Sequence, residues 1–173
     1  VVNAGVHFIL KNQVGKSFET YEYVYENGIE DYVKECVGED SLTSIQTWQG
    51  DAIGRDREDL PDYKLKMNFS LTFSNKVQLK EFYHNSSFLA NGGSPDKAVR
   101  SAFVSSFDKY MKAAGKYNKS ESKIIFSDIE DSLVLVVNSF STMPSFENQT
   151  KKSISSDFIQ KSMTEFFSKT LES

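Results

Sequence analysis

The clearest pattern along the chain is an alternation of apolar and polar residues in KLKMNFSLTF, residues 64–73. The apolar side chains occupy every second position, at Leu65, Met67, Phe69, Leu71 and Phe73. Because successive side chains of a strand point to opposite faces, this pattern predicts a half-buried antiparallel strand. The next run, VQLKEFYHNSSF at residues 77–88, is interpreted as its hairpin partner.

Three segments repeat apolar residues at helical spacing. Residues 28–38 predict a short helix that Gly38 ends. Ser94 as N-cap and Pro95 in the first turn predict the longest helix, whose apolar stripe ends at Gly115. A last helix is predicted from Ser156, with an apolar face of Ile159, Met163, Phe166, Phe167 and Leu171.

The remaining segments predict strands, loops and one short turn. Residues 133–140 form a continuous apolar run, which is typical of a central strand buried on both faces. Residues 5–25 predict a hairpin, and TSIQTW at 43–48 predicts a strand. GRDREDLPD at 54–62 predicts an exposed loop, and SDIEDS at 127–132 a short helix or turn. Together these elements predict an α+β fold, a mixed or antiparallel sheet with helices on one face.

Composition narrows the function only by exclusion. The 173 residues suffice for one domain with a sizeable core, and no apolar run approaches the length of a spanning helix. A net charge of −4 argues against a protein that coats nucleic acid through bulk charge. A single cysteine cannot form an internal disulfide, which favours a reducing, intracellular context. The opening VVNAGVHFIL lacks an initiator Met, so we expect part of a longer protein.

Few residues carry a signature of catalysis. His7 and His84 have no Cys, Asp or Glu at metal-ligand spacing, and no nucleophile elbow occurs. Cys36 lies on an apolar helix face, where an inert thiol is expected. The carboxylates of residues 128–131 are interpreted as helix-terminal caps rather than an acid and base pair. Four Asn-x-Ser/Thr sequons, one of them at Asn85, are interpreted as chance.

Two polar regions could bind an anion. One is a basic run along and beyond the longest helix, for which a solvated face is favoured over a phosphate contact: Lys109, Lys112, Lys116, Lys119 and Lys123. The other is PSFENQTKKS at residues 144–153, which offers amide, hydroxyl and ammonium donors between a buried strand and a helix. The residues alone leave this second region open between an anion site and an ordinary polar loop.

Four segments, in order, resemble one family. YVYENGIEDYVKE resembles an aromatic-x-Tyr-Glu-Gly-Gly-Ile segment, and NGGSPDKAVRSAFVSSFDKYM resembles a Gly-Gly-Thr-His loop with its long helix. SDIEDSLVLVVNSF is similar to an Asp-Ile-Arg-Glu-Gly-Leu strand entry, and PSFENQTKKS to a Pro-x-Phe-x-x-Gln-Thr-Lys loop. These are landmarks of the transducer domain of type IIA DNA topoisomerase ATPase subunits, as in gyrase B and topoisomerase IV B. Asn27, Ser94, Pro95, Glu130 and Ser132 depart from the family pattern.

The resemblance implies a fold and a domain boundary. It implies a βαβ unit with a left-handed crossover, as in the ribosomal-protein domain 2-like superfamily. Residues 1–25 would be the end of a preceding GHKL-type ATP-binding domain or an entry hairpin, and residues 26–173 the transducer.

The resemblance also implies a site. Gln149 and Lys151 would contact the γ-phosphate of ATP, supported by Thr150, Gly92 and Gly93. ATP and Mg²⁺ would be bound mainly by the preceding domain. This segment alone would therefore hold no cofactor, metal or complete catalytic set, and would be inactive. Apart from the resemblance, the basic run is a candidate DNA-facing surface.

The implied function is to relay ATP binding and hydrolysis to the DNA gate and to strand passage. The implied localisation is the cytoplasm, with the nucleoid. The implied partners are DNA, the topoisomerase A (cleavage) subunit and a second copy of the same B-type subunit, with no membrane. Two alternatives remain at this point: the transducer-like domain of a MutL-type GHKL ATPase, and a non-catalytic binding module.

Overall fold

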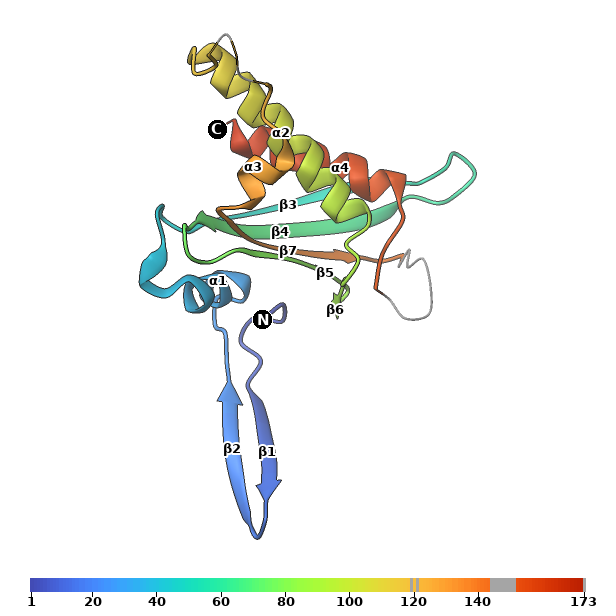
Figure 1. The fold of residues 1–173 in the computed structure, drawn as a ribbon. Helices are drawn as coiled ribbons and strands as arrows, with labels where there is room; N and C mark the ends of the chain where they lie inside the picture. The colour runs from blue at the N-terminus through green and yellow to red at the C-terminus, as the bar shows by residue number, and fades with distance from the viewer. Residues whose placement is uncertain (119, 121, 144–151, 173) are drawn as a thin grey trace.

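The protein folds around one five-stranded mixed sheet, which confirms the predicted α+β class (Figure 1). A computed structural model describes residues 1–118, 120, 122–143 and 152–172. The strand order is β3-β4-β7-β5-β6, and a separate hairpin pairs β1 with β2. The sheet strands are β3 Gln46–Gly54, β4 Tyr63–Phe73, β5 Leu79–His84, β6 Ser87–Phe88 and β7 Leu133–Ser141.

Strand β7 lies in the middle of the sheet, as its continuous apolar run predicts. It pairs antiparallel with β4 and parallel with β5. The prediction that residues 77–88 form the hairpin partner of β4 is therefore wrong. A strand with apolar side chains on both faces is buried only at the centre of a sheet, so β7 separates the two. Strand β5 instead turns at Asn85 and Ser86 and pairs with the short β6.

Helices cover both faces of the sheet, although the sequence predicted one. Helices α2 Ser94–Ala113, α3 Phe126–Glu130 and α4 Asp157–Leu171 lie on one side, and α1 Ile29–Val37 on the other (Figure 1). A one-turn 3₁₀ helix, Gly38–Asp40, follows α1. The larger core lies under α2 and α4, and alternate residues of β7 divide between the two sides. Val134 and Val136 pack with α1, whereas Leu133, Leu135 and Val137 pack in the larger core.

The βαβ unit runs from β5 through α2 and α3 to β7. Pro95 occupies the first turn of α2, as predicted. Ser94 is not the N-cap, because that place belongs to Gly93. The Ser94 hydroxyl instead donates to the backbone oxygen of Ser156, 2.9 Å away.

The first strand of the sheet begins later than predicted and continues through two glycines. Strand β3 starts at Gln46 rather than at residue 43, and it includes Gly50 and Gly54. A Cβ at Gly50 would lie 2.8 Å from the ring of Phe166, and one at Gly54 would lie 2.4 Å from the ring of Phe158. These glycines therefore let α4 approach the sheet edge instead of breaking the strand.

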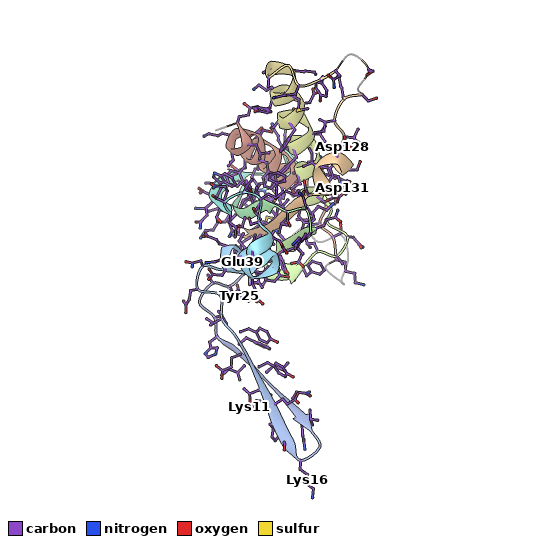
Figure 2. All side chains as sticks on the ribbon, turned by 60° about the vertical axis from the view of Figure 1, so that its left-hand side comes forward. Lys11, Lys16, Tyr25, Glu39, Asp128 and Asp131 are labelled. Atoms are coloured by element: carbon purple, nitrogen blue, oxygen red, sulfur yellow. The ribbon has the colours of Figure 1, made fainter. Side chains whose placement is uncertain are left out.

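The N-terminal hairpin projects away from the sheet (Figures 1 and 2). It consists of β1 Phe8–Val14 and β2 Ser17–Tyr23, and all its residues are exposed. Figure 2 shows Lys16 at its far end and Tyr25 where it joins the body. Across the part of the chain that the structure describes, no helix is both long and apolar enough to cross a bilayer.

Candidate functional site

The polar segment predicted to contact a phosphate connects β7 to α4. Gln149, Thr150 and Lys151 lie outside the described residues. The described chain does include the two points where this segment joins the fold: the end of β7, up to Met143, and the stretch from Lys152 into α4.

The stretch that leads into α4 lies against the Gly-Gly loop before α2. Asn91 N donates to Lys152 O at 2.9 Å, and Ser94 N donates to Ile154 O at 2.9 Å. Gly93, at φ +87°, forms a parallel bridge with Ile154, and a Cβ there would lie 2.2 Å from Ile154 O. The predicted supporting glycine Gly93 therefore meets the chain just beyond the predicted loop, in a contact that only glycine permits.

The start of α4 is held by polar groups from two other segments. Ser156 is the N-cap, and its hydroxyl accepts from Ile159 N. Ser156 N donates to the Ser94 hydroxyl at 2.8 Å. Asp56 accepts from Ser156 Oγ at 2.6 Å, from Phe158 N at 3.1 Å and, through its second oxygen, from Tyr63 Oη at 2.8 Å.

These bonds set the charge state of Asp56. Burial alone would raise the pKa of its carboxyl, but the hydrogen bonds from Ser156, Tyr63 and the backbone outweigh burial and lower that pKa. Asp56 is thus a stably ionised anchor between the loop of residues 55–62 and α4. Sequence reasoning treated that loop as only exposed and charged.

The end of β7 is held by the end of β5, its parallel neighbour in the sheet. His84 is fully buried, with Nδ1 2.8 Å from Ser139 Oγ and Nε2 3.1 Å from Ser141 Oγ. Ser141 Oγ donates to Met143 O at 2.6 Å. Burial lowers the pKa of His84 to about 4, so the imidazole is neutral near pH 7 and serves as a hydrogen-bonding group.

The two histidines and the cysteine have separate surroundings in the described part of the chain. Searching it finds no group of three His, Cys, Asp or Glu side chains that could hold a metal. The exposed His7 contacts Glu22 at 3.0 Å, within the hairpin region. Burial raises the pKa of the Cys36 thiol, which makes it less reactive at neutral pH.

The basic run is partly neutralised by neighbouring carboxylates. Lys109 Nζ lies 2.9 Å from Glu172 Oε2, and Lys112 Nζ lies 2.5 Å from Asp108 Oδ2. No ion pair is found for Lys116 or Lys123 within the described residues, and Lys119 lies outside them. The positive character of this surface is therefore smaller than its lysine count indicates.

The acidic residues near α3 have structural partners. Asp128 accepts from Ile125 N at 2.9 Å, at the start of α3. Glu130 pairs with Lys80, and Lys80 lies 3.1 Å from Asp96 Oδ1. Lys80 also lies 5.1 Å from the ring centroid of Phe126. Asp128 is thus a helix-terminal cap, as the sequence predicted, whereas Glu130 is an ion-pair partner rather than a cap.

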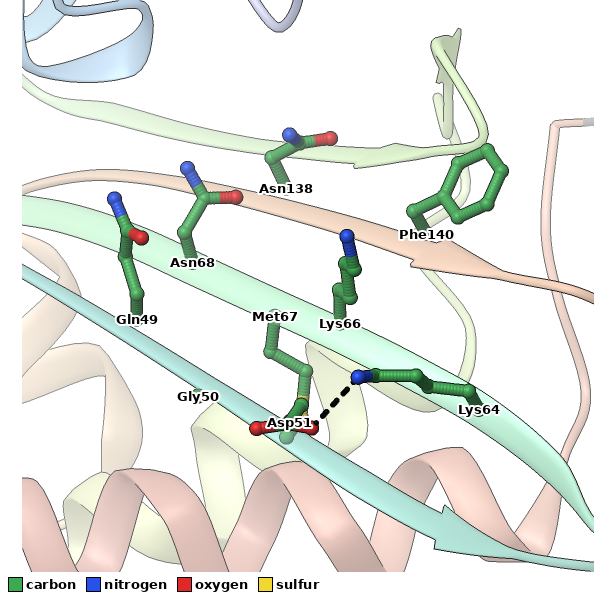
Figure 3. Close-up of a pocket in the computed structure, with 9 residues that line it drawn as sticks. All are labelled: Gln49, Gly50, Asp51, Lys64, Lys66, Met67, Asn68, Asn138 and Phe140. Atoms are coloured by element: carbon green, nitrogen blue, oxygen red, sulfur yellow. Dashed lines mark ion pairs between the residues drawn. The ribbon is translucent and has the colours of Figure 1, made fainter.

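A hollow of about 480 Å³ lies on the α1 side of the sheet, over the part of that face that α1 does not cover (Figure 3). Gln49, Asn68 and Asn138 stand side by side there on three neighbouring strands. Lys64 pairs with Asp51 at 3.1 Å. Among the sequence-predicted site residues that the structure describes, none lines this hollow.

Solved structures share this fold. The 43K ATPase domain of Thermus thermophilus gyrase B, crystallised in complex with an aminocoumarin, is similar with a TM-score of 0.61 and 18% identity. The match covers 98% of this chain and 44% of that one. The B-subunit of the DNA gyrase from Myxococcus xanthus has a TM-score of 0.65 and 12% identity, over 88% of this chain and 46% of that one.

Proteins that are similar in sequence are also B subunits of type II topoisomerases. The DNA gyrase B protein of Micrococcus luteus is 26% identical over 152 residues, 83% of this chain and 20% of that protein. The DNA topoisomerase 4 B protein of Rickettsia prowazekii is 23% identical over 137 residues, 79% of this chain and 20% of that protein. The chain thus spans about a fifth of the length of these relatives. The family model for DNA gyrase B matches residues 28–173, which is most of the chain, and the protein belongs to the DNA gyrase B family.

Proposed function

We propose that this chain is the transducer region of an ATP-dependent type IIA DNA topoisomerase B subunit, in which Gln149 and Lys151 sense the γ-phosphate of ATP. Family membership supports the topoisomerase part of the proposal. The Gln-Thr-Lys sequence in residues 144–153 supports the sensing part. One observation carries the sensing part. The chain is anchored on both sides of residues 144–151, at Ser141 and at Ile154, and both anchors are hydrogen bonds to the same short stretch, residues 85–94.

The proposed chemistry is electrostatic. The Lys151 ammonium is a point charge suited to a terminal phosphate, and the Gln149 amide supplies a neutral donor. ATP and Mg²⁺ would be bound mainly by the ATP-binding domain that precedes this region in the family. The described residues contain no carboxylate cluster fit for a metal, so no metal step is assigned to them. This region would be inactive alone.

The proposed relay uses the rigid elements around the segment. Loss of the γ-phosphate would remove the contact of Lys151, and a ligand shifts a conformational equilibrium by its difference in affinity between the two states. Strand β7 and helix α4 would carry that shift to the rest of a homodimeric B subunit. The A subunit and DNA would be the partners of the complete enzyme. The family match favours this proposal over a MutL-type ATPase.

The test is the ATPase activity of the complete parent protein, titrated with DNA. Lys151→Ala should lower turnover by about tenfold or more, because a charge contact to the reacting phosphate is lost. Lys152→Ala is the matched control, since Lys152 is the adjacent exposed lysine and its backbone bond to Asn91 survives the change. Equal turnover in wild type and Lys151→Ala would refute sensing and favour a non-catalytic binding module.

A further inference from the structure

Strand β5 ends at His84, but its pairing with β7 is continued by a side chain. His84 is opposite Ser139 in the parallel ladder. The chain then turns away to β6, with Asn85 at φ +47° and Ser86 at φ +63°. Asn85 N still donates to Ser139 O at 2.9 Å.

The Asn85 side chain then takes the place of the next peptide group. Its Oδ1 accepts from Ser141 N at 2.9 Å, and its Nδ2 donates to Ser141 O at 3.1 Å. An amide side chain carries one carbonyl and one NH₂ group, so it can satisfy both backbone groups of a strand residue. We call this pair of bonds the Asn85 clamp.

The clamp is well placed to fix the backbone. Ser141 is 2% exposed, and it is the last residue of β7. Two hydrogen bonds to one residue, made in a partly buried site, restrict both its position and its orientation. The His84 contacts to the Ser139 and Ser141 hydroxyls lie directly beside it.

The same short stretch also holds the other joining point. Residues 84–94 contain Asn85 at one end, and Gly93 and Ser94 at the other. Gly93 and Ser94 contact Ile154 and Ser156, as described above. One continuous stretch therefore fixes where the chain leaves β7 and where it returns towards α4.

We propose that Asn85 is a positioning residue for nucleotide sensing. Its clamp fixes the end of β7, and thereby the point at which the segment that carries Lys151 leaves the sheet. This inference rests on the proposed function. Asn85 touches no reacting atom and acts through Ser141. Because a misplacement of about 1 Å can cost up to about a hundredfold in rate, two lost backbone bonds suffice for a measurable effect.

The test is a double-mutant cycle in the complete parent protein. Asn85→Gly removes the clamp and keeps the left-handed backbone favourable. Ser86→Gly is the matched control, because it relaxes the same turn and leaves the clamp intact. We expect Asn85→Gly to lower ATPase turnover by about tenfold and Ser86→Gly to have little effect. In a Lys151→Ala background, Asn85→Gly should cause no further loss.

A purely structural role predicts a different result. Loss of folded protein would lower turnover by the same factor in both backgrounds, so additive losses would overturn the inference while the proposed function stands. Normal turnover in Asn85→Gly would do the same. If Lys151→Ala has no effect, the proposed function fails and the inference fails with it.

A second measurement does not depend on turnover. In Asn85→Gly the Ser141 amide loses its acceptor, so its hydrogen exchange should accelerate by about tenfold or more, while amides in the α2 and α4 core stay protected. Unchanged exchange at Ser141 in Asn85→Gly would show that the clamp does not hold the strand end, and would overturn the inference.

Discussion

The backbone of Gly93 lies against that of Ile154, which follows the predicted loop. Gly93→Ala would place a Cβ 2.2 Å from Ile154 O at a residue with φ +87°. We expect a loss of about 3 kcal/mol or more in the free energy of unfolding, measured by urea denaturation. Gly38→Ala is the control, because Gly38 also has positive φ but no atom lies within 4 Å of the place its methyl group would take. Equal losses in the two variants would mean that backbone strain, and not the contact, dominates.

The buried His84 gives the protein a specific acid sensitivity. Its pKa is about 4 in the fold and 6.5 unperturbed, so between these values the unfolded chain binds a proton that the folded chain does not. Stability therefore falls as the pH drops, by about 2 kcal/mol from this group between pH 7 and pH 5.

The measurement is urea denaturation at both pH values for wild type and His84→Gln. Ionisation of the carboxylates affects both proteins alike, so the difference between the two drops isolates His84. The variant should lose about 2 kcal/mol less than wild type over this interval. An identical drop in both proteins would contradict a neutral, buried imidazole.

At the scale of elements, Asp56 joins the loop of residues 55–62 to the start of α4. Asp56→Ala removes three hydrogen bonds to an ionised carboxylate and leaves Ser156 Oγ and Tyr63 Oη without this partner. We expect a loss of about 2 to 3 kcal/mol in the free energy of unfolding. Asp59→Ala, which breaks only an exposed pair with Arg57, should change it by less than about 0.5 kcal/mol. A small effect at Asp56 would show that α4 needs no anchor from this loop.

Elements whose residues show a regular apolar pattern could be predicted from the sequence. The pairing of strands that are distant in the sequence could not. Strand β4 and helix α4 lie where the alternation and the helical spacing place them. The parallel partner of β5 is a strand some fifty residues later, and no local pattern encodes that choice. The face that α1 covers was missed because amphipathicity shows that a helix has a buried side, without showing which side of the sheet receives it.

The site was predictable only where a resemblance existed. The Gly-Gly loop drew attention to Gly92 and Gly93, and Gly93 does contact the chain beyond the predicted loop. Asn85 carried no such signal, since it lay within a run interpreted as a strand and within a sequon interpreted as chance. Its clamp depends on a residue that lies 56 positions away, which only the folded structure brings near.

At the scale of the whole molecule, the proposed DNA-facing surface is reduced to the lysines for which no ion pair is found within the described residues. Among the described residues of the basic run these are Lys116 and Lys123, since Lys109 and Lys112 have ion-pair partners. In the complete parent protein, replacing Lys116 and Lys123 by Gln should weaken DNA binding and lower the slope of log K against log salt by about two. Replacing Lys11 and Lys16 of the hairpin is the charge-matched control. Equal slopes in all three proteins would remove DNA from the roles of this surface.

The hairpin and the body should unfold independently. Gly5 N donates to Tyr25 O at 2.9 Å, so the two ends of the hairpin segment already lie side by side. The apolar side chains of the hairpin strands are all exposed, and an isolated two-stranded ribbon is marginally stable in water. Replacing residues 6–24 by a short Gly-Ser linker should therefore change the free energy of unfolding of residues 26–172 by less than about 0.5 kcal/mol.

Urea denaturation followed through the fluorescence of Trp48 makes this measurement, because Trp48 lies in β3, against Phe69 of the sheet. An unchanged midpoint would agree with the domain boundary near residue 25 that the resemblance implies. A loss of more than about 2 kcal/mol would mean that the hairpin stabilises the body through contacts absent from this structure, and the boundary would have to move. The exposed apolar row of Phe8, Leu10, Tyr21 and Tyr23 would then be the first place to seek those contacts, since these residues lie opposite one another on one face of the ribbon.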